Sequence, residues 1–353
     1  MPRRKGASPL ACYALVVPGI EDLAARELRA AGATVGETLT GFDRRDSIVL
    51  LSTGDASALL RCGLVEDVFL VLLDVPVAPI ASGAKRLSKL LERPVLEQAM
   101  LVHHALRPKT RGRSYKVVAR VAGPHAFRRE DVETSFGRAL AVLLPHWLPA
   151  RDAAVEIWVH IVGSRAIVGL RLSGDELAQR KYKRAHLPAS LKPTVARALV
   201  ALSEPRPEDI VLDPMCGAGT ILRERTDAAA SRVVLGGDID RGALAAAKEN
   251  AGRRPRLARW DATRLPVRDA AVDAVIVNPP YGRQHGDIRG LDVLYRKALR
   301  EAARILRPGG RIVLLTGEPR TLLESLPTLL RVRTRRRVLL RGLPVTAFVI
   351  VRS

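Results

Sequence analysis

The chain has 353 residues, with 58 Lys and Arg against 36 Asp and Glu, which gives a formal net charge of +22. Hydrophobic residues make up 47% of it, which excludes a disordered chain, and Asp74 and Pro76 interrupt the longest apolar stretch, which argues against a membrane-spanning helix. So positive a charge predicts a polyanionic partner, and the low aromatic content of 4% favours a folded RNA over a stacked single strand.

Residues 10–17 are apolar and follow a basic amino terminus, a combination that superficially imitates a signal peptide. Pro18-Gly-Ile-Glu-Asp22 follows at once, without a small-residue cleavage pattern. We therefore expect a first strand over residues 10–17 and then an amphipathic helix through Arg29. Because a catalytic core occupies only about 160 residues, we also expect a second folded region within residues 1–190.

The cysteines and histidines predict no metal site. Cys12, Cys62 and Cys216 are scattered and odd in number, which fits neither a disulfide framework nor a metal cage. His103 and His104 are adjacent and cannot copy the i, i+4 pair of a helical zinc site. We expect a monomeric protein of the reducing cytoplasm, without metal or membrane attachment.

The middle of the chain alternates strand-like segments, over residues 114–119, 155–159 and 166–170, with a helix over 129–144. Basic residues gather beside the first of these strands and again after the last. The expected RNA-binding residues are Arg107, Lys109, Arg111, Arg113, Lys116, Lys181, Lys183 and Arg184. A third arginine-rich stretch covers residues 331–341. Mutational bias toward arginine raises the total charge but does not explain these clusters.

The second half opens with a helix expected from Pro193 and a buried strand over residues 210–213. Gly217 and Gly219 follow, and then a helix from Thr220. Glycines let a ligand approach the backbone, and the amino terminus of a helix offers unpaired N–H groups to a carboxylate. A lone Gly-x-Gly is weak evidence of a ligand-binding loop.

Acidic residues follow the next two strand-like segments. Asp238 comes after a strand over residues 231–237, where its carboxylate can accept both hydroxyls of a ribose. Asp240 fits the N-cap of the helix from Arg241 better than it fits a ribose contact. Asp261 is suited to accept from an adenine amino group, and a solvated loop residue is the alternative.

A strand over residues 271–277 then leads into Asn278-Pro279-Pro280-Tyr281. A helix over residues 295–306, a turn at 307–310 and a strand over 311–316 complete the pattern. Repeated βα units predict an α/β fold with a doubly wound, Rossmann-like sheet, whose ligands bind at the carboxyl ends of the strands.

The tetrapeptide has the chemistry of a site that methylates an exocyclic amine. Such a nitrogen is a poor nucleophile because its lone pair is delocalised, so a catalyst needs acceptors for its N–H bonds. The side-chain oxygen of Asn278 and a backbone carbonyl in the Pro279-Pro280 turn can supply them, and Tyr281 is placed to stack on a base. Taken alone, the tetrapeptide is equally compatible with an ordinary turn.

In this order, the motifs over residues 191–353 resemble class I S-adenosylmethionine-dependent methyltransferases, and best the tRNA guanine-N2 methyltransferases. The resemblance implies that Asn278, Pro279, Pro280 and Tyr281 are catalytic. Residues 187–194 resemble the entry motif of that group, with Thr194 as the contributor. The implied cofactor-binding residues are Thr194, Asp213, Met215, Cys216, Gly217, Ala218, Gly219, Thr220, Asp238, Ile239, Asp261, Ala262 and Asn278.

The amino-terminal half resembles the α+β region that accompanies this group. We expect a ferredoxin-like domain over residues 1–60, a THUMP domain over 61–172, a linker over 173–190 and the methyltransferase domain over 191–353. The resemblance implies that THUMP holds the tRNA acceptor end and its CCA. The linker reads Arg180-Lys-Tyr-Lys-Arg184 where relatives often have a glycine before the tyrosine, which leaves the target position open.

The expected function is methyl transfer from S-adenosylmethionine to N2 of a tRNA guanosine, at position 6 of the acceptor stem. Alternative targets are guanosine 10 of tRNA, a guanine in 23S rRNA and a protein glutamine. A noncatalytic RNA-binding protein is the alternative from another class.

Overall fold

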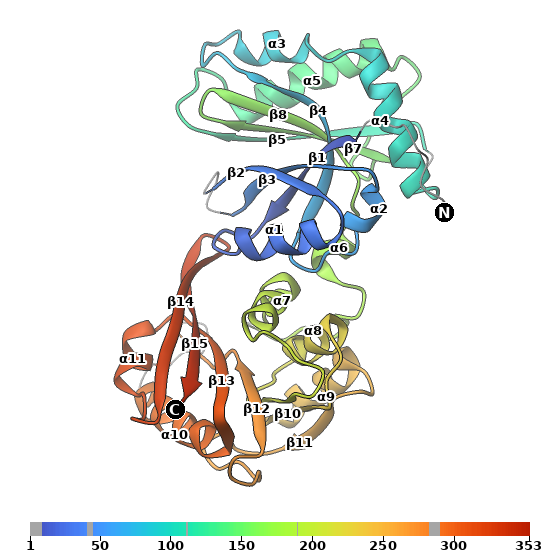
Figure 1. Cartoon of the computed structure of the whole chain (residues 1–353). Helices are drawn as coiled ribbons and strands as arrows, with labels where there is room; N and C mark the ends of the chain where they lie inside the picture. Colours follow the sequence, from blue (N-terminus) through green and yellow to red (C-terminus); the bar gives the residue numbers. More distant parts are fainter. Residues whose placement is uncertain (1–8, 41–44, 111, 189, 282–289) are drawn as a thin grey trace. The chain divides into compact units, whose positions relative to one another are not determined.

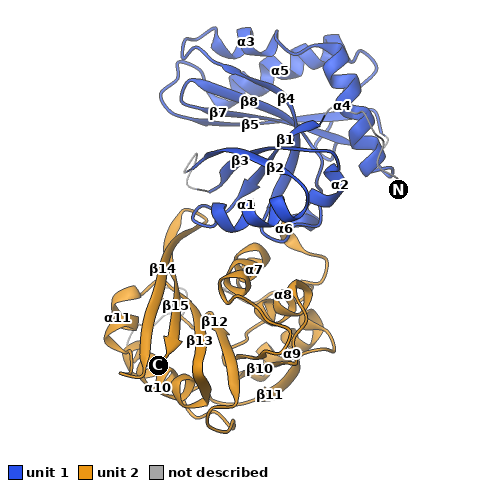
Figure 2. Ribbon diagram, viewed as in Figure 1, with its two compact units in different colours: residues 1–177 blue, residues 178–353 orange. Residues whose placement is uncertain are grey.

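The computed structural model describes residues 9–40, 45–110, 112–188, 190–281 and 290–353. The chain (Figure 1) divides into two compact units, Met1–Leu177 and Ala178–Ser353, which Figure 2 shows in blue and orange. The boundary falls within the expected linker over residues 173–190. The expected subdivision of the first unit at residue 60 stays a prediction.

The first unit is built on one eight-stranded sheet in the order β2-β3-β1-β4-β8-β7-β5-β6. Its pairs are antiparallel except that β5 runs parallel to both β6 and β7. The strands predicted from residues 10, 114, 155 and 166 are confirmed. The strands are β1 (Leu10–Val16), β2 (Thr34–Leu39), β3 (Ser47–Thr53), β4 (Asp67–Pro76), β5 (Ser114–Ala122), β6 (Leu148–Pro149), β7 (Val155–Val162) and β8 (Arg165–Arg171).

The helices of the first unit include both of those predicted from the sequence. In α1, Leu23 and Leu28 are buried, and the acidic Glu21 and Asp22 in the first turn suit the positive end of the helix dipole. α6 spans the boundary between the units. The helices are α1 (Glu21–Ala30), α2 (Ala56–Leu59), α3 (Gly83–Ser88), α4 (Arg93–Leu106), α5 (Arg129–Leu143) and α6 (Glu176–Gln179).

The second unit contains a seven-stranded sheet in the order β11-β10-β9-β12-β13-β15-β14. β9 to β13 are parallel, and β15 and β14 add two antiparallel strands at one edge. The order reverses between β9 and β12, which confirms the doubly wound, Rossmann-like prediction. The strands are β9 (Ile210–Asp213), β10 (Val233–Asp238), β11 (Arg256–Arg259), β12 (Val272–Val277), β13 (Leu306–Thr316), β14 (Leu330–Leu340) and β15 (Leu343–Arg352).

The helices of the second unit follow the predicted alternation. They are α7 (Pro193–Leu202), α8 (Thr220–Ala228), α9 (Arg241–Ala251), α10 (Leu291–Ile305) and α11 (Pro319–Glu324). α10 begins at Leu291 rather than at Tyr295, directly after Gly290, whose left-handed φ of 83° starts the helix. Within the described ranges, every helix is too short or too polar to cross a membrane.

The turn predicted at residues 307–310 lies within β13 rather than before it, because the strand predicted from Arg311 already begins at Leu306. This segment belongs to β13, because Leu306 already pairs with Val272 of β12. The next aligned pair is Ala274 with Arg311. Residues 307–310 therefore have no aligned partner in β12 and form a bulge within the strand pair. Gly309 supplies the positive φ of 73° that the bulge requires.

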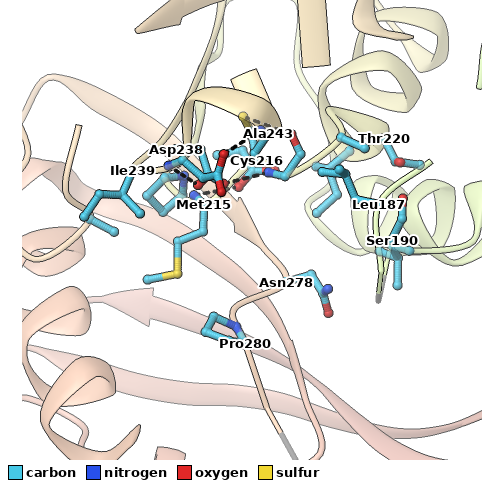
Figure 3. Close-up of a pocket in the computed structure, with 18 of the residues that line it drawn as sticks. Leu187, Ser190, Met215, Cys216, Thr220, Asp238, Ile239, Ala243, Asn278 and Pro280 are labelled. Atoms are coloured by element: carbon cyan, nitrogen blue, oxygen red, sulfur yellow. Dashed lines mark hydrogen bonds between the residues drawn. The ribbon is translucent and has the colours of Figure 1, made fainter. Parts of the chain in front are cut away.

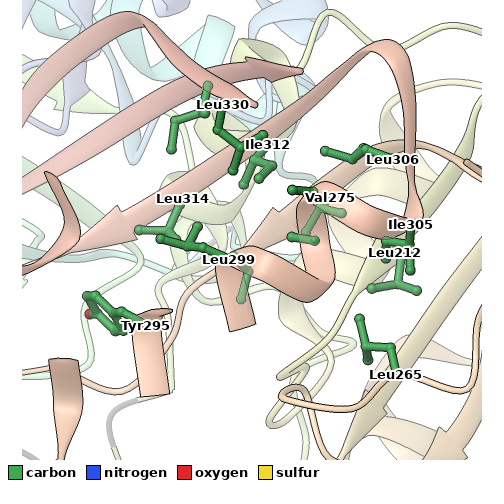
Figure 4. Close-up of a cluster of buried hydrophobic side chains, with 14 of the residues drawn as sticks. Leu212, Leu265, Val275, Tyr295, Leu299, Ile305, Leu306, Ile312, Leu314 and Leu330 are labelled. Atoms are coloured by element: carbon green, nitrogen blue, oxygen red, sulfur yellow. The ribbon is translucent and has the colours of Figure 1, made fainter. Parts of the chain in front are cut away.

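Two of the buried clusters in the second unit, one apolar and one polar, bear on the stability of its sheet. The apolar one packs α10 against the sheet through side chains that include Tyr295, Leu299 and Ile312 (Figure 4). The polar one surrounds Asp209, which is 2% exposed. Its carboxylate lies 2.5 Å from the guanidinium of Arg311 and 3.7 Å from that of the fully buried Arg225.

Replacing Asp209 with Ala leaves two buried guanidinium groups without their carboxylate. Removing one partner of a buried ion pair costs about 3–5 kcal/mol, so we expect Asp209→Ala to lower the free energy of unfolding of the second unit by that amount. Arg296→Ala is the control, because its ion pair with Asp292 joins side chains that are 52% and 54% exposed and should contribute less than about 1 kcal/mol. Urea unfolding of the full chain, followed by circular dichroism, measures both variants, and equal midpoints would contradict the expectation.

Candidate active site

A cavity of about 450 Å³ opens at the carboxyl ends of β9, β10 and β12, where the strand order reverses. Its volume lies in the range of small-molecule sites. Figure 3 shows Asn278 and Pro280 across the cavity from Asp238, with Leu187 and Ser190 on a third side. The predicted residues that line it are Asp213, Met215, Cys216, Gly217, Ala218, Thr220, Asp238, Ile239, Asp261, Ala262, Asn278 and Pro280.

Four predicted residues do not line the cavity. Thr194 is fully buried in the first turn of α7, and Pro279 is buried behind Asn278. Gly219 faces α9 instead, since a Cβ there would lie 3.0 Å from the Cα of Ala247. Gly219 therefore permits close packing between the loop and a helix, not the approach of a ligand. Tyr281 is half-buried beside the cavity.

The loop after β9 is held by backbone hydrogen bonds to acidic side chains. Asp213 is 1% exposed and accepts from the backbone N–H of Met215 at 3.2 Å. Burial, and then repulsion from Asp238, raises the pKa of Asp213 well above its ordinary value. The backbone N–H of Gly217 donates to Oδ2 of Asp238 at 2.9 Å, which ties the loop to the end of β10.

Asp238 is oriented by the backbone on both of its oxygens. Its Oδ1 accepts from the N–H of Asp240 at 3.0 Å, while Oδ2 accepts from Gly217. Asp240 caps α9, because its Oδ1 accepts from the N–H groups of Gly242 and Ala243, and the N-cap prediction is confirmed. Asp238 is thus the better-placed carboxylate for a ribose.

Trp260 does not line the cavity, but it supports the cavity in a way that the sequence did not suggest. Its indole N–H donates to the carbonyl of Pro214 at 3.0 Å and so joins the ends of β9 and β11. A Cβ at Gly237 would lie 2.1 Å from its ring, so the glycine is needed there. The following residue, Asp261, accepts from both the N–H and the hydroxyl of Thr263 at 2.8 Å, which fixes one carboxylate oxygen.

Asn278 presents an unused acceptor. Its Oδ1 is buried and finds no hydrogen-bond partner among the described residues. The carbonyl of Pro280 already accepts from the hydroxyl of Tyr295 at 3.2 Å, which uses one of its two lone pairs. We therefore predict that the second acceptor is the carbonyl of Pro279. An unsatisfied buried oxygen costs about 1–3 kcal/mol, which suits a group reserved for a ligand.

The aromatic rings near Asn278 are held by the end of β13. The Tyr295 hydroxyl also lies 2.9 Å from Oγ1 of Thr316. The Tyr281 ring rests against Gly317, where a Cβ would come within 2.8 Å of it. Burial raises the pKa of Tyr281 above its ordinary value. Thr316 and Gly317 were not identified from the sequence because they are distant from the tetrapeptide along the chain.

The segment before α7 forms one wall of the cavity. Leu187, Pro188, Ser190 and Leu191 line it, and only a general resemblance over residues 187–194 pointed to this segment. Asn250 of α9, which is 1% exposed, fastens the segment in place. Its Nδ2 donates to the carbonyls of Ala185 and Ala218 at 2.8 and 2.9 Å, so it joins this wall to the loop after β9.

A second anchor holds the start of the same segment. Glu224 is 3% exposed and accepts from the hydroxyl of Tyr182 at 2.6 Å. Arg180 and Arg197 also lie near its carboxylate, at 3.5 and 3.9 Å. Burial raises the pKa of Glu224, and the Tyr182 hydrogen bond opposes that rise.

Some of the residues predicted to bind RNA are exposed, whereas others donate hydrogen bonds to backbone carbonyls of the protein. In the first unit, Lys109 and Arg113 are exposed, Lys116 is half-exposed, and Arg107 donates to the carbonyl of Ser173 at 2.6 Å. Arg111 lies outside the described residues. In the second unit, Lys181 and Arg184 are exposed, whereas Lys183 turns inward and donates to the carbonyl of Leu191.

Comparison with known proteins gives matches that agree with one another. The family described as "RMKL-like, methyltransferase domain" matches residues 180–338. A tRNA (guanine(6)-N2)-methyltransferase of Thermus thermophilus is 33% identical over 315 residues, which cover 88% of this chain and 90% of the relative. The chain belongs to the tRNA (guanine-N2)-methyltransferase family. The family and the S-adenosylmethionine-dependent enzyme class predicted from the motifs are thereby confirmed.

Two further relatives agree with this membership. The crystal structure of TrmN from Thermus thermophilus superimposes with a TM-score of 0.80 at 29% identity and covers 98% of this chain and 100% of that one. The mouse tRNA (guanine(6)-N(2))-methyltransferase THUMP3 is 29% identical over 230 residues, which are 60% of this chain and 45% of the relative.

Asn250→Ala should weaken binding of S-adenosylmethionine. The substitution leaves the carbonyls of Ala185 and Ala218 unpaired, and each such loss costs about 1–3 kcal/mol, so we expect affinity to fall about tenfold or more. Glu249→Ala changes the adjacent, exposed residue of α9 and should leave affinity unchanged. Titration calorimetry compares the two, and similar dissociation constants would show that Asn250 does not shape the cavity.

Proposed function

We propose that this enzyme transfers a methyl group from S-adenosylmethionine to the exocyclic N2 of guanosine 6 in the acceptor stem of tRNA. The observation that carries the proposal is the buried, unpartnered Oδ1 of Asn278 at the wall of the cavity. The Thermus and mouse relatives, both tRNA (guanine(6)-N2)-methyltransferases, support the target. Bound S-adenosylmethionine supplies an electrophilic methyl group that needs no further activation.

The residues around the cavity fit that donor. Asp238, fixed by two backbone N–H groups, has lone pairs left to accept ribose hydroxyls. The loop over Gly217 and the amino end of α8 suit the carboxylate of the methionine portion. Asp261, with one oxygen held by Thr263, has its second oxygen for the adenine amino group.

The acceptor side of the reaction depends on hydrogen-bond acceptors. Oδ1 of Asn278 and the carbonyl of Pro279 would each take one N–H of the guanine amino group. Held in this way, the nitrogen becomes more pyramidal and its lone pair turns toward the methyl group. The ring of Tyr281 would stack on the base. Such positioning is worth roughly 7–11 kcal/mol when reacting atoms are held in near-attack geometry.

The first unit would supply tRNA recognition, through a THUMP domain over residues 61–172 that holds the acceptor stem and CCA end. The exposed Lys109 and Arg113 are suited to phosphate contacts. There are three competing outcomes: the enzyme methylates guanosine 10 of tRNA, it methylates 23S rRNA, or it methylates no RNA. The experiments below distinguish them.

Asn278→Ala should slow the chemical step by about 10²–10³, the effect of losing one preorganised polar group, while leaving donor affinity nearly unchanged. Asp238→Ala should do the reverse, because it removes a ribose contact. Single-turnover methylation and donor calorimetry on both variants separate the two roles. An Asn278→Ala rate within about threefold of the parent would refute its catalytic assignment.

Guanosine 6 should be the methylated nucleotide. A tRNA transcript in which adenosine replaces guanosine 6 should accept no methyl group, whereas the same change at position 10 should leave incorporation unchanged. Nucleoside mass spectrometry after enzymatic methylation reports the product and its stoichiometry. Methylation that survives the change at position 6 would move the target elsewhere, and methylation of 23S rRNA alone would replace tRNA as the substrate.

A further inference from the structure

The edge strand β14 is unusually rich in arginine. It closes one side of the second sheet, pairs only with β15, and reads Leu-Arg-Val-Arg-Thr-Arg-Arg-Arg-Val-Leu-Leu. Arg331, Arg335 and Arg337 are exposed and form no ion pair within the described residues. Arg333 differs, since it pairs with Glu204 at 2.6 Å. The strand thus carries several uncompensated positive charges.

The strand register places two of these arginines level with the candidate active site. β14 is antiparallel to β15 and β15 to β13, so β14 points in the same direction as β13. Arg337 pairs with Thr346, which pairs with Thr316, the residue that hydrogen-bonds Tyr295. Two strand spacings separate Arg337 from Thr316, a backbone distance of about 10 Å.

Arg335 lies level with the start of the tetrapeptide by the same reasoning. It pairs with Phe348, which pairs with Leu314, which in turn pairs with Val277. Val277 immediately precedes Asn278, so about 14 Å of sheet separates Arg335 from the start of the catalytic segment. Arg335 and Arg337 are two residues apart in an uninterrupted part of the strand pair, so they lie on one face of the strand.

The hairpin continues beyond the carboxyl end of β13. Leu340 pairs with Leu343, so Arg341 and Gly342 form a two-residue turn in which both φ values are positive, at 50° and 84°. This turn type favours Asn or Gly at its first central position, and an arginine there is an unfavourable choice for the backbone. Burial, and then repulsion from Arg341, lowers the pKa of Lys183 to about 8.

We propose that Arg335, Arg337 and Arg341, the β14 arginine edge, bind phosphates of the RNA strand that carries the target guanosine. This inference rests on the proposed function. Guanidinium groups make paired hydrogen bonds to phosphate oxygens, which suits them to grip an RNA backbone beside a base that enters the active site. The catalytic unit would then hold its substrate directly, in addition to any contact from the first unit.

Charged side chains also protect edge strands from pairing with other chains. This alternative makes a different prediction, because it requires only that the arginines keep the protein from associating with itself. A test must therefore measure both RNA binding and the oligomeric state.

The test compares R335Q/R337Q with R253Q/R254Q in the full chain. Arg253 and Arg254 are exposed, form no ion pair within the described residues, and precede β11 at the opposite end of the strands, so the control removes the same charge elsewhere. Binding of a tRNA transcript is measured by fluorescence anisotropy over a range of salt concentrations. Donor affinity is measured by calorimetry, and the oligomeric state by light scattering.

R335Q/R337Q should bind tRNA roughly tenfold more weakly at 0.1 M salt, and its slope of log affinity against log salt should be smaller by about 2. R341Q should reduce the slope by about 1. Donor affinity and the methylation rate at saturating tRNA should match the parent, and R253Q/R254Q should keep the parent slope.

Equal affinity and slope in R335Q/R337Q and R253Q/R254Q would overturn the inference. So would self-association of R335Q/R337Q with tRNA binding unchanged per protomer, which would assign the arginines to edge protection. These failures differ from failure of the proposed function, in which the parent itself would bind donor yet methylate no tRNA.

Discussion

The reversal of strand order between β9 and β12 is the constraint on which the site depends. At that point the connections leave in opposite directions, so the carboxyl ends of adjacent parallel strands leave room for a ligand. The loop after β9, Asp238 after β10 and Asn278 after β12 all meet there. The pairing of these strands is sufficient to bring the residues at their ends together. The buried ion pairs around Asp209 and the apolar packing of α10 keep that sheet in place.

The chemistry of the site follows from what it leaves unpaired. Most polar groups around the cavity are satisfied: Asp238 by two backbone donors, Asp240 by its helix, and the Pro280 carbonyl by Tyr295. Oδ1 of Asn278 and the hydroxyl of Ser190, which also lines the cavity, are the buried exceptions among the described residues. A buried acceptor without a partner destabilises the free protein and is stabilised by a ligand with N–H groups. With the carbonyl of Pro279 as the proposed second acceptor, an amino group fits this requirement because it offers two donors, whereas a hydroxyl offers only one.

Much of this arrangement was predictable from the sequence, and the failures share one cause. The parallel strands could be predicted from short apolar runs such as residues 210–213 and 271–277, and the helix cap could be predicted from Asp240. Both predictions depend only on residues that are close together in the sequence. Long-range pairing was not visible. The bulge in β13 depends on Val272, the cavity wall depends on Asn250, and the closeness of Gly219 to Ala247 reflects packing between α8 and α9. Lys183 was predicted to be an exposed cation because the neighbouring residues are basic. In the structure its ammonium group instead donates to a backbone carbonyl.

Choice of the target nucleotide is a separate problem from the chemistry. In the proposed function the acceptors at Asn278 recognise an amino group, and every guanosine carries the same one at N2. Phosphate contacts carry no sequence information but fix the register of a nucleic acid on a protein. The position that is methylated must then be set by how far the phosphate-binding surfaces lie from Asn278 along the RNA. Within the catalytic unit, strand register fixes that distance for Arg335 and Arg337, since hydrogen-bonded strands do not slide when one face of the sheet is buried. In the proposed binding mode, the sheet that builds the donor cavity therefore also fixes the distance between the phosphate-binding arginines and Asn278.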